Sequence, residues 1–333
     1  MADRRPRLED VAAAVGVSTA SVSLVLRGAP GPSAGTREKV LDAATRLGYR
    51  PDRAASLLAR RRSRLLGVML EVRSSFHAEL VEDLHEVAET RGYDLVLSTV
   101  TRTRDEARAV ETLVDSRCEA LILLGPDAPA PRLAALDAQL PVVVVGRPMP
   151  ATAGVDVVRA ADDEGTARAV EYLAELGHSE IVHVDGGPTD IASGRVRGYR
   201  DAMARLGVEP RVVPGDQTEE AGIEAARTLL DGDELPTAVV CFNDRIAIGL
   251  LDALVRAGVD VPGRVSVIGY DDSPLARLAH VDLTTVSQNT HEMTERAVEL
   301  AVERLEGDRS GHREVVLPPT LVVRGTTAPP CAR

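Results

Sequence analysis

The sequence predicts two fold classes in one chain: an all-α helix-turn-helix head, then an α/β body of two doubly wound, parallel-sheet lobes. Apolar residues recur at helical spacing in the N-terminal part, whereas from Leu65 onward short apolar runs alternate with amphipathic stretches. The length of 333 residues also exceeds that of a usual single domain, so two or three domains are expected.

The head shows two short helical patterns separated by a glycine. Apolar residues from Leu8 repeat at helical spacing and pause at Gly16, which suits a turn because a positive φ costs least without a Cβ. Ser18 is the expected N-cap of a second helix that ends near Leu26. Two short helices joined by a short, glycine-containing turn form a helix-turn-helix. Ser33 is the expected N-cap of a third helix, at about 36–47.

Charge is divided unevenly between the two parts. Residues 1–64 hold 13 Arg or Lys against 6 Asp or Glu, a net charge of +7, whereas the remaining residues hold 26 against 45, a net of −19. A basic head on an acidic body is typical of a DNA-binding domain joined to a part that does not bind DNA. The alternative is an ordinary three-helix bundle that binds nothing, and the charge argues against it.

The body shows two series of strands and helices. Strands are expected at 65–70, 94–100, 120–125 and 142–146, with helices at 78–91 and 104–117. The pattern restarts with helices at 162–176, 193–206, 219–230 and 243–257 and strands at 181–186, 237–242 and 265–270. Near-continuous apolar strands between amphipathic helices indicate parallel strands that are buried on both faces. Ligands of such sheets bind beyond the carboxyl ends of the strands.

Several segments of the chain resemble the head and hinge of the LacI family of bacterial transcription regulators. They are LEDVA (8–12), VGVSTASVS (15–23), TREKVLDAATRLGYRPD (36–52) and AASLLARRRSRLLGV (54–68), and the resemblance continues to about residue 327. It implies a periplasmic-binding-protein-like body in which the chain crosses between the lobes near 160, 287 and 317. The helix at 293–306 is then expected to return to the first lobe, and the segment 321–327 to the second.

Four parts of the chain are therefore expected. They are a helix-turn-helix DNA-binding domain at 1–50, a hinge at 51–64, a first effector-binding lobe at 65–160 and 288–317, and a second lobe at 161–287 and 318–333. No apolar heptads follow Thr327, so a C-terminal coiled coil that forms tetramers is not expected.

The resemblance assigns DNA contacts to the second helix, whose N-terminal residues reach base edges in the major groove. It places Thr19, Ala20 and either Ser23 or Leu24 toward the groove, with Ser18 and Ser21 nearer the phosphates. Leu24 stands where the family often has Arg and offers only apolar contact, for instance to a thymine methyl, so the usual half-site is in doubt. Arg27 is expected to contact phosphate, with a compensating base contact as the alternative.

The hinge is compatible with a helix over 52–59, but this segment is too short to hold a helix alone in water. The resemblance implies that it folds only on DNA, paired with its dimer mate in the minor groove. Leu58 aligns with the leucine that wedges between central base pairs, and Ala55 with the small residue beside it. Tyr49, Arg53 and Arg61 complete the expected DNA contacts. The alternative is an Arg-rich flexible linker, whose arginines neutralise phosphates in either case.

Residues at the predicted strand ends are the effector candidates. They are Phe76 and His77 after the first strand, Arg147 after VVVVG, Phe242 and Asn243 in CFND, Asp271 in GYDD, and Arg195, which the resemblance assigns to gripping the effector. Arg195 offers a planar fork of donors, while Asn243 and Asp271 accept from hydroxyls. Phe76 and Phe242 are the only two phenylalanines, and both are expected at the cleft mouth, where a ring could stack on a sugar or base. Alternatively, Asn243 and Asp271 are caps and turn formers, and Arg197 takes the place of Arg195.

Motifs of catalysis are missing from the sequence. It holds no Gly-rich phosphate loop, G-x-S-x-G elbow or zinc-protease spacing, so no catalytic residue, cofactor or metal is expected. Three scattered cysteines favour a reduced, cytoplasmic setting over a disulfide framework. No apolar run is long enough to span a membrane, and the N-terminus lacks the apolar region of a secretory signal.

These observations predict a homodimeric regulator, by resemblance usually a repressor, that reads an inverted repeat in double-stranded DNA. Its small-molecule effector is expected to be a sugar, with a purine or another metabolite as the next choice. The dimer interface is expected on first-lobe helices at 76–91 and 101–117. A solute-binding receptor of the same fold is disfavoured by the basic head, and a sugar-metabolising enzyme by the missing base, nucleophile and metal ligands.

Overall fold

The computed structural model describes residues 6–26, 28–49, 62–232, 234–307 and 311–331. The chain divides into two compact units, one ending at Ser63 and the other beginning at Arg64. The first unit is a helical head, and the second is an α/β body. Among the described residues no single helix is long and apolar enough to cross a membrane; only the bent pair α1 and α2 together reaches that length and composition.

The described part of the head contains three helices: α1 (Leu8–Val15), α2 (Thr19–Leu26) and α3 (Ala34–Leu47). Gly16 adopts a φ of +73° in the turn, and α1 and α2 meet at 105°, as the predicted helix-turn-helix requires. Both predicted caps form, because Ser21 N donates to Ser18 Oγ at 3.1 Å and Thr36 N donates to Ser33 Oγ at 3.3 Å. Small apolar side chains of all three helices make the head core: Val11, Ala12, Val22, Val25, Val40, Ala43 and Ala44.

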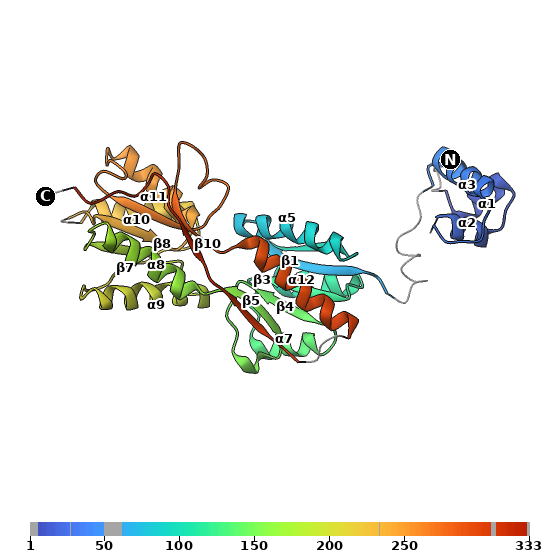
Figure 1. The fold of residues 1–333 in the computed structure, drawn as a ribbon, viewed down its shortest axis with the longest axis horizontal. Helices are drawn as coiled ribbons and strands as arrows, with labels where there is room; N and C mark the ends of the chain where they lie inside the picture. The colour runs from blue at the N-terminus through green and yellow to red at the C-terminus, as the bar shows by residue number, and fades with distance from the viewer. Residues whose placement is uncertain (1–5, 27, 50–61, 233, 308–310, 332–333) are drawn as a thin grey trace. The chain divides into compact units, whose positions relative to one another are not determined.

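The body holds two six-stranded sheets, one in each lobe (Figure 1). The first sheet has the order β11-β5-β4-β3-β1-β2, and the second has the order β12-β10-β9-β8-β6-β7. The strand pairs are parallel except for β10 with β12, which is antiparallel. Two α/β lobes with parallel sheets confirm the predicted fold class.

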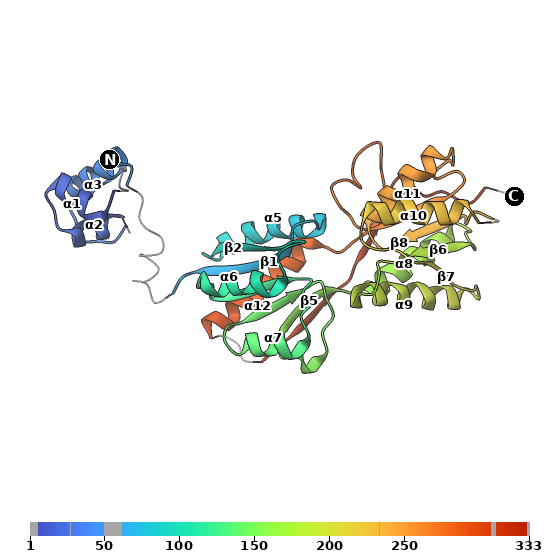
Figure 2. The same ribbon diagram turned by 180° about the vertical axis from the view of Figure 1, so that it is seen from behind.

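The first lobe consists of its sheet and the α-helices that cover the two faces of that sheet. Its strands are β1 (Leu65–Glu71), β2 (Asp94–Val100), β3 (Ala120–Leu124), β4 (Val142–Val145), β5 (Asp156–Ala160) and β11 (Glu314–Leu317). Its helices are α5 (Ser75–Thr90), α6 (Glu106–Asp115), α7 (Ala130–Asp137) and α12 (Thr290–Glu306), with a short 3-10 turn at Ala151–Ala153. Apolar residues of α5 and α12 pack on one face of the sheet, and those of α6 and α7 on the other (Figure 2).

The second lobe repeats this arrangement. Its strands are β6 (Ile181–Val184), β7 (Arg211–Val213), β8 (Ala238–Cys241), β9 (Ser266–Asp271), β10 (Thr284–Ser287) and β12 (Thr320–Val322). Its helices are α8 (Asp162–Glu175), α9 (Asp190–Arg205), α10 (Glu219–Leu230) and α11 (Asp244–Arg256). Residues of α10 and α11 cover one face, and those of α8 and α9 the other.

Three segments connect the lobes. The chain passes from β5 to α8 at 160–162, from β10 to α12 at 287–290, and from β11 to β12 at 317–320. Because the strands of each sheet are parallel, their carboxyl ends lie together at one edge. The connections place these two edges opposite each other, and this arrangement positions the cavity between the lobes.

Candidate DNA-binding head and effector cleft

Helix α2 is the helix predicted to contact the bases of DNA, and its N-terminal end is exposed. Ser18, Thr19 and Ala20 are exposed, whereas Ser21, Ser23 and Leu24 are half-buried. The hydroxyls of Ser18 and Ser21 lie 2.9 Å apart, so they hydrogen-bond to each other at the N-terminus of the helix. Tyr49 packs half-buried against the head core. Arg27, Arg53, Ala55, Leu58 and Arg61 lie outside the described residues, as does the predicted hinge helix.

A cavity of about 560 Å³ lies between the two lobes, and we call it the interlobe cavity. Loops that follow β1, β3 and β4 line it from the first lobe, and loops that follow β6, β7, β8 and β9 line it from the second. Of the predicted effector residues, five line it: Phe76, His77, Arg147, Asn243 and Asp271. Arg195 and Phe242 lie beneath its surface instead.

On the first-lobe side of the interlobe cavity, the rings of Phe76 and His77 lie at the start of α5. The backbone N–H of Glu71 donates to Nδ1 of His77 at 3.1 Å, which places the hydrogen of the neutral ring on Nε2. Burial lowers the pKa of His77 to about 4, so this imidazole is neutral near pH 7. Phe76 is half-buried and packs against the first-lobe core, with its ring centroid 6.4 Å from that of His77. The wall thus offers one aromatic ring and one neutral imidazole.

Two arginines link the lobes across the interlobe cavity. Arg147 Nη2 donates to Asp190 Oδ2 at 2.8 Å, and Arg147 also donates to the carbonyl oxygens of Pro126 and Ala128. From the opposite lobe, Arg245 Nη1 donates to the carbonyl oxygen of Arg73 at 3.3 Å. The lobes are therefore held together by side chains as well as by the three connecting segments.

Arg195 occupies a different place from the one that we predicted. Its side chain is only 3% exposed, and its Nε donates to Asp162 Oδ1 at 2.8 Å. The guanidinium also donates to the carbonyl oxygen of Phe242 and lies 3.5 Å above the ring of Tyr270. Because these partners occupy the guanidinium, Arg195 joins α8, α9 and the ends of β8 and β9 under the cavity and does not line it.

The ring of Phe242 likewise differs from the expectation of an open cleft mouth. It is 4% exposed, and the guanidinium of Arg195 lies 4.4 Å from its centroid. The ring also covers Gly186, where an added Cβ would lie 2.3 Å from it. The side chain turns inward because α11 begins two residues later, so this segment packs against the second-lobe core.

Asn243 and Asp271 serve as cap and turn residues and line the cavity as well. Ile246 N donates to Asn243 Oδ1 at 2.9 Å, which caps α11. Gln288 Nε2 donates to Asp271 Oδ1 at 2.7 Å, and Asp271 has a φ of +114°. Burial raises the pKa of Asp271 to about 8 against the opposing charge of Arg195, so its carboxyl holds a proton near pH 7.

Asp162 and Asp190 are not among the predicted effector residues, although they pair with Arg195 and Arg147. Asp162 and Asp190 each begin a helix, where a carboxylate is most simply explained by the helix dipole. Tyr270 belongs to the predicted GYDD loop, but its ring lies beneath the cavity against the guanidinium of Arg195. Their roles depend on Arg195 and Arg147, which lie far away in the sequence, and local pattern carries no signal for such pairs.

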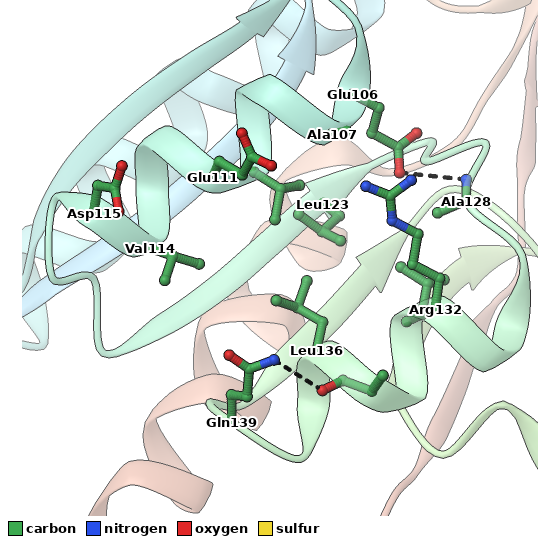
Figure 3. Close-up of a pocket in the computed structure, with 13 residues that line it drawn as sticks. Glu106, Ala107, Glu111, Val114, Asp115, Leu123, Ala128, Arg132, Leu136 and Gln139 are labelled. Carbon is green, nitrogen blue, oxygen red and sulfur yellow. Dashed lines mark hydrogen bonds between the residues drawn. The ribbon is translucent and has the colours of Figure 1, made fainter.

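A second cavity, of about 450 Å³, lies between α6 and α7 of the first lobe (Figure 3). Leu123 and Leu136 form part of its apolar lining, and Glu111 and Gln139 lie at its rim. It contains none of the predicted effector residues. Nowhere among the described residues do three or more His, Cys, Asp or Glu side chains cluster as they would to hold a metal ion.

Comparison with known proteins identifies relatives of both parts. Residues 7–52 match the family of bacterial regulatory proteins of the lacI type, and residues 170–327 match a periplasmic binding protein-like domain. The transcriptional regulator DegA of Bacillus subtilis is 32% identical over 330 residues, which cover 96% of this chain and 97% of DegA. The regulator CelR of Thermobifida fusca is 34% identical over 336 residues, covering 96% of this chain and 98% of CelR.

Solved structures agree with the sequence relatives. The lac repressor dimer bound to operator and an anti-inducer matches with a TM-score of 0.85 and 29% identity, covering 98% of this chain and 100% of that one. A complex of the regulator CelR with cellobiose matches with a TM-score of 0.72 and 32% identity, covering 97% of this chain and 100% of that one.

Proposed function

Because the chain belongs to the LacI family of bacterial regulatory proteins, it is a DNA-binding transcriptional regulator with a ligand-binding body, and we propose that it is a repressor controlled by a sugar. The interlobe cavity is the observation that carries the effector half of this proposal. It lies at the carboxyl ends of both sheets, where open α/β sheets bind ligands. Its lining is mainly polar with one aromatic ring, which suits a carbohydrate.

The similar CelR structure contains cellobiose, which supports a sugar as the effector. Relatives named as the purine repressor PurR are 30% identical, so a purine is the second candidate. We assign Phe76, His77, Arg147, Asn243 and Asp271 to direct effector contact, and Arg195 with Phe242 to the floor that positions Asp271. This set revises the predicted roles of Arg195 and Phe242.

For the DNA half, we propose that two heads of a homodimer read an inverted repeat. The similar lac repressor structure is a dimer bound to its operator. Thr19, Ala20 and Ser23 or Leu24 would face the bases, and Ser18, Ser21, Arg27, Tyr49, Arg53 and Arg61 the backbone, with Ala55 and Leu58 in the minor groove. Because half-site spacing follows from dimer symmetry, the operator is expected to be palindromic.

Effector and operator affinities are coupled through the lobes in this proposal. A ligand that favours one arrangement of the lobes changes the first-lobe interface, and with it the placement of the two hinges. By linkage, the effector changes operator affinity by the same factor as the operator changes effector affinity.

The test is a gel shift of the purified protein with a library of symmetric duplexes and excess random competitor. Specific retardation that a sugar relieves supports a sugar-controlled repressor. If the protein retards a duplex specifically and only a purine changes this retardation, the effector is a purine and not a sugar. A protein that prefers no symmetric duplex at moderate salt, with or without metabolites, refutes the proposal.

A further inference from the structure

Four helices begin at the interlobe cavity: α5, α9, α10 and α11. The N-terminus of a helix carries unpaired N–H groups and the positive end of the helix dipole, and both attract anions. A cavity with four such ends would ordinarily suit a phosphate or a carboxylate. Whether it does so here depends on what already occupies the helix ends.

Side chains of this chain cap all four ends. The bonds run from His77 N to Ser74 Oγ at 3.2 Å, Ala192 N to Thr189 Oγ1 at 3.2 Å, Ala221 N to Thr218 Oγ1 at 3.3 Å, and Ile246 N to Asn243 Oδ1 at 2.9 Å. The first turns of α9, α10 and α11 also hold carboxylates, among them Asp190, Glu219 and Asp244. One N–H group at each of these helix ends therefore already has a partner in the chain, and three of the four ends also carry a carboxylate that offsets the helix dipole.

The cationic side chains at the interlobe cavity are compensated as well. The three arginines that line it are each paired: Arg73 with Glu71 at 3.2 Å, Arg147 with Asp190 at 2.8 Å, and Arg245 with Glu219 at 2.5 Å. His77, the one lining histidine among the described residues, is neutral near pH 7. An anionic group would therefore have to displace a carboxylate of the chain to reach any of these arginines.

Two carboxylates remain at the rim without an ion pair in the described part of the chain. Asp127 follows β3 and Asp216 follows β7, and both are exposed. Asp216 Oδ1 accepts only the backbone N–H of Gln217, at 2.7 Å. The lining thus carries surplus negative charge beside hydroxyl and amide groups, so a ligand with its own negative charge is repelled on approach.

Resting on the proposed effector function, we infer that this cavity takes an uncharged polyhydroxyl ligand and rejects sugar phosphates and sugar acids. Hydroxyl groups can donate to Asp127, Asp216 and Asp190 and accept from the capping side chains. A phosphate or carboxylate would lose its water and gain a cation only by displacing a carboxylate of the chain. Discrimination then comes from repulsion at the rim and from the absence of a free cation among the described lining residues.

The experiment separates ligands by charge before their identity is known. Polar bacterial metabolites are freed of cations on a cation-exchange resin and then passed over an anion-exchange resin at neutral pH. The retained, anionic fraction and the unretained, uncharged fraction are each added to the full-length protein. Its melting temperature and its retardation of operator DNA are measured. We expect the unretained fraction alone to change both. A retained fraction that acts, alone or with the other, overturns the inference and leaves the effector function standing. If operator DNA is bound and neither fraction acts, the proposed effector control fails as well.

The Asp127→Asn/Asp216→Asn double variant tests the rim. We expect the retained fraction to raise the melting temperature of this variant at a concentration that leaves the wild type unchanged, because losing one close like-charge repulsion in water raises anion affinity about fivefold. The matched control is Asp115→Asn/Asp231→Asn, which neutralises two exposed carboxylates, one in each lobe, outside the interlobe cavity. If the retained fraction affects the rim variant no more than it affects the control, Asp127 and Asp216 do not exclude anions.

Discussion

At the residue scale, the Arg195–Asp162 pair is the most buried ion pair in the described body, with side chains 3% and 8% exposed and Nε 2.8 Å from Oδ1. A buried pair adds little over an apolar pair of similar size, but losing one partner strands the other charge. Arg195 also lies 3.8 Å from Asp271 Oδ1 and stacks on Tyr270. It therefore connects the stability of the second lobe to the position of a cavity residue.

We expect Arg195→Ala to lower the free energy of unfolding by about 3–5 kcal/mol, because Asp162 would stay buried without its partner. Denaturant titration of the full-length protein measures this. Under conditions where the variant is folded, it should bind operator and fail to respond to effector. Arg197→Ala is the matched control, since its pair with Asp163 is exposed and should be worth less than about 1 kcal/mol. A stable Arg195→Ala protein with normal effector response would contradict this role.

The protonation of Asp271 predicts a pH dependence. Burial raises its pKa to about 8, whereas a carboxyl in an unfolded chain titrates near 3.9. Between these values the folded chain keeps a proton that the unfolded chain releases, so the free energy of unfolding falls as pH rises, by up to about 1.4 kcal/mol per unit. Above the folded pKa the decline ends.

Asp271→Asn should remove this contribution, because the amide does not titrate. Denaturant titrations from pH 5 to 9 compare the variant with the wild type, and the difference between their stabilities should grow toward alkaline pH. Asp216→Asn, at an exposed carboxylate, should give a curve parallel to the wild type. If the Asp271→Asn curve is also parallel, Asp271 is ionised in the folded state, which contradicts its raised pKa.

At the scale of elements, the sequence predicted best those helices and strands that carry their own signals. Ser33 marks the start of α3, and the five buried residues of β3 form an unbroken apolar run. Strand β10 went unpredicted because TTVS has no apolar run, and β11 because it is short and largely exposed at a sheet edge. Helix α5 begins three residues before the predicted start at 78, because Ser74 caps it.

The lining of the interlobe cavity was also predicted only in part. Five strand-end residues line it as expected, because the carboxyl ends of parallel strands meet at one edge. Arg195 and Phe242 turn inward because Asp162, Tyr270 and Gly186 leave room and partners for them. Side-chain direction after a strand depends on such distant residues, and a local pattern does not contain it.

The hinge prediction also belongs to this scale, and it rests on the family resemblance because Leu58 lies outside the described residues. We expect Leu58→Ala to weaken specific operator binding at least about tenfold, since the wedge between base pairs would be lost. Weak, salt-sensitive binding to random duplexes should persist. Fluorescence anisotropy with both duplexes measures the two affinities, and Leu57→Ala is the neighbouring control. Unchanged operator affinity in Leu58→Ala would mean that Leu58 is no wedge.

At the scale of the whole body, hydrogen bonds between described side chains and the opposite lobe include Arg147 to Asp190, and Arg245 to the carbonyl oxygen of Arg73. The Asp190 side chain is 57% exposed, so its pair with Arg147 should be worth no more than about 1 kcal/mol. A link of this strength biases the lobes toward each other and still allows them to separate.

Asp190→Asn should therefore shift the population of separated lobes by no more than about fivefold. Small-angle scattering of the unliganded protein should show a larger radius of gyration, and the exchanged pair Arg147→Asp/Asp190→Arg should reverse the change. Asp163→Asn breaks an exposed pair within the second lobe and serves as the control. If Asp190→Asn and Asp163→Asn scatter alike, the Arg147–Asp190 pair does not influence the arrangement of the lobes.

The three crossings also set an order of assembly on the ribosome. During synthesis, β1 through β5 leave the ribosome first. Helix α12, which covers one face of their sheet, and β11, which completes that sheet, follow from residue 290 onward. Until then, β5 keeps an unpaired edge, and the apolar face that α12 will cover stays open to water. The first lobe to begin synthesis is thus completed only after nearly all of the second has been made, and a chain that ends before α12 would be prone to aggregation.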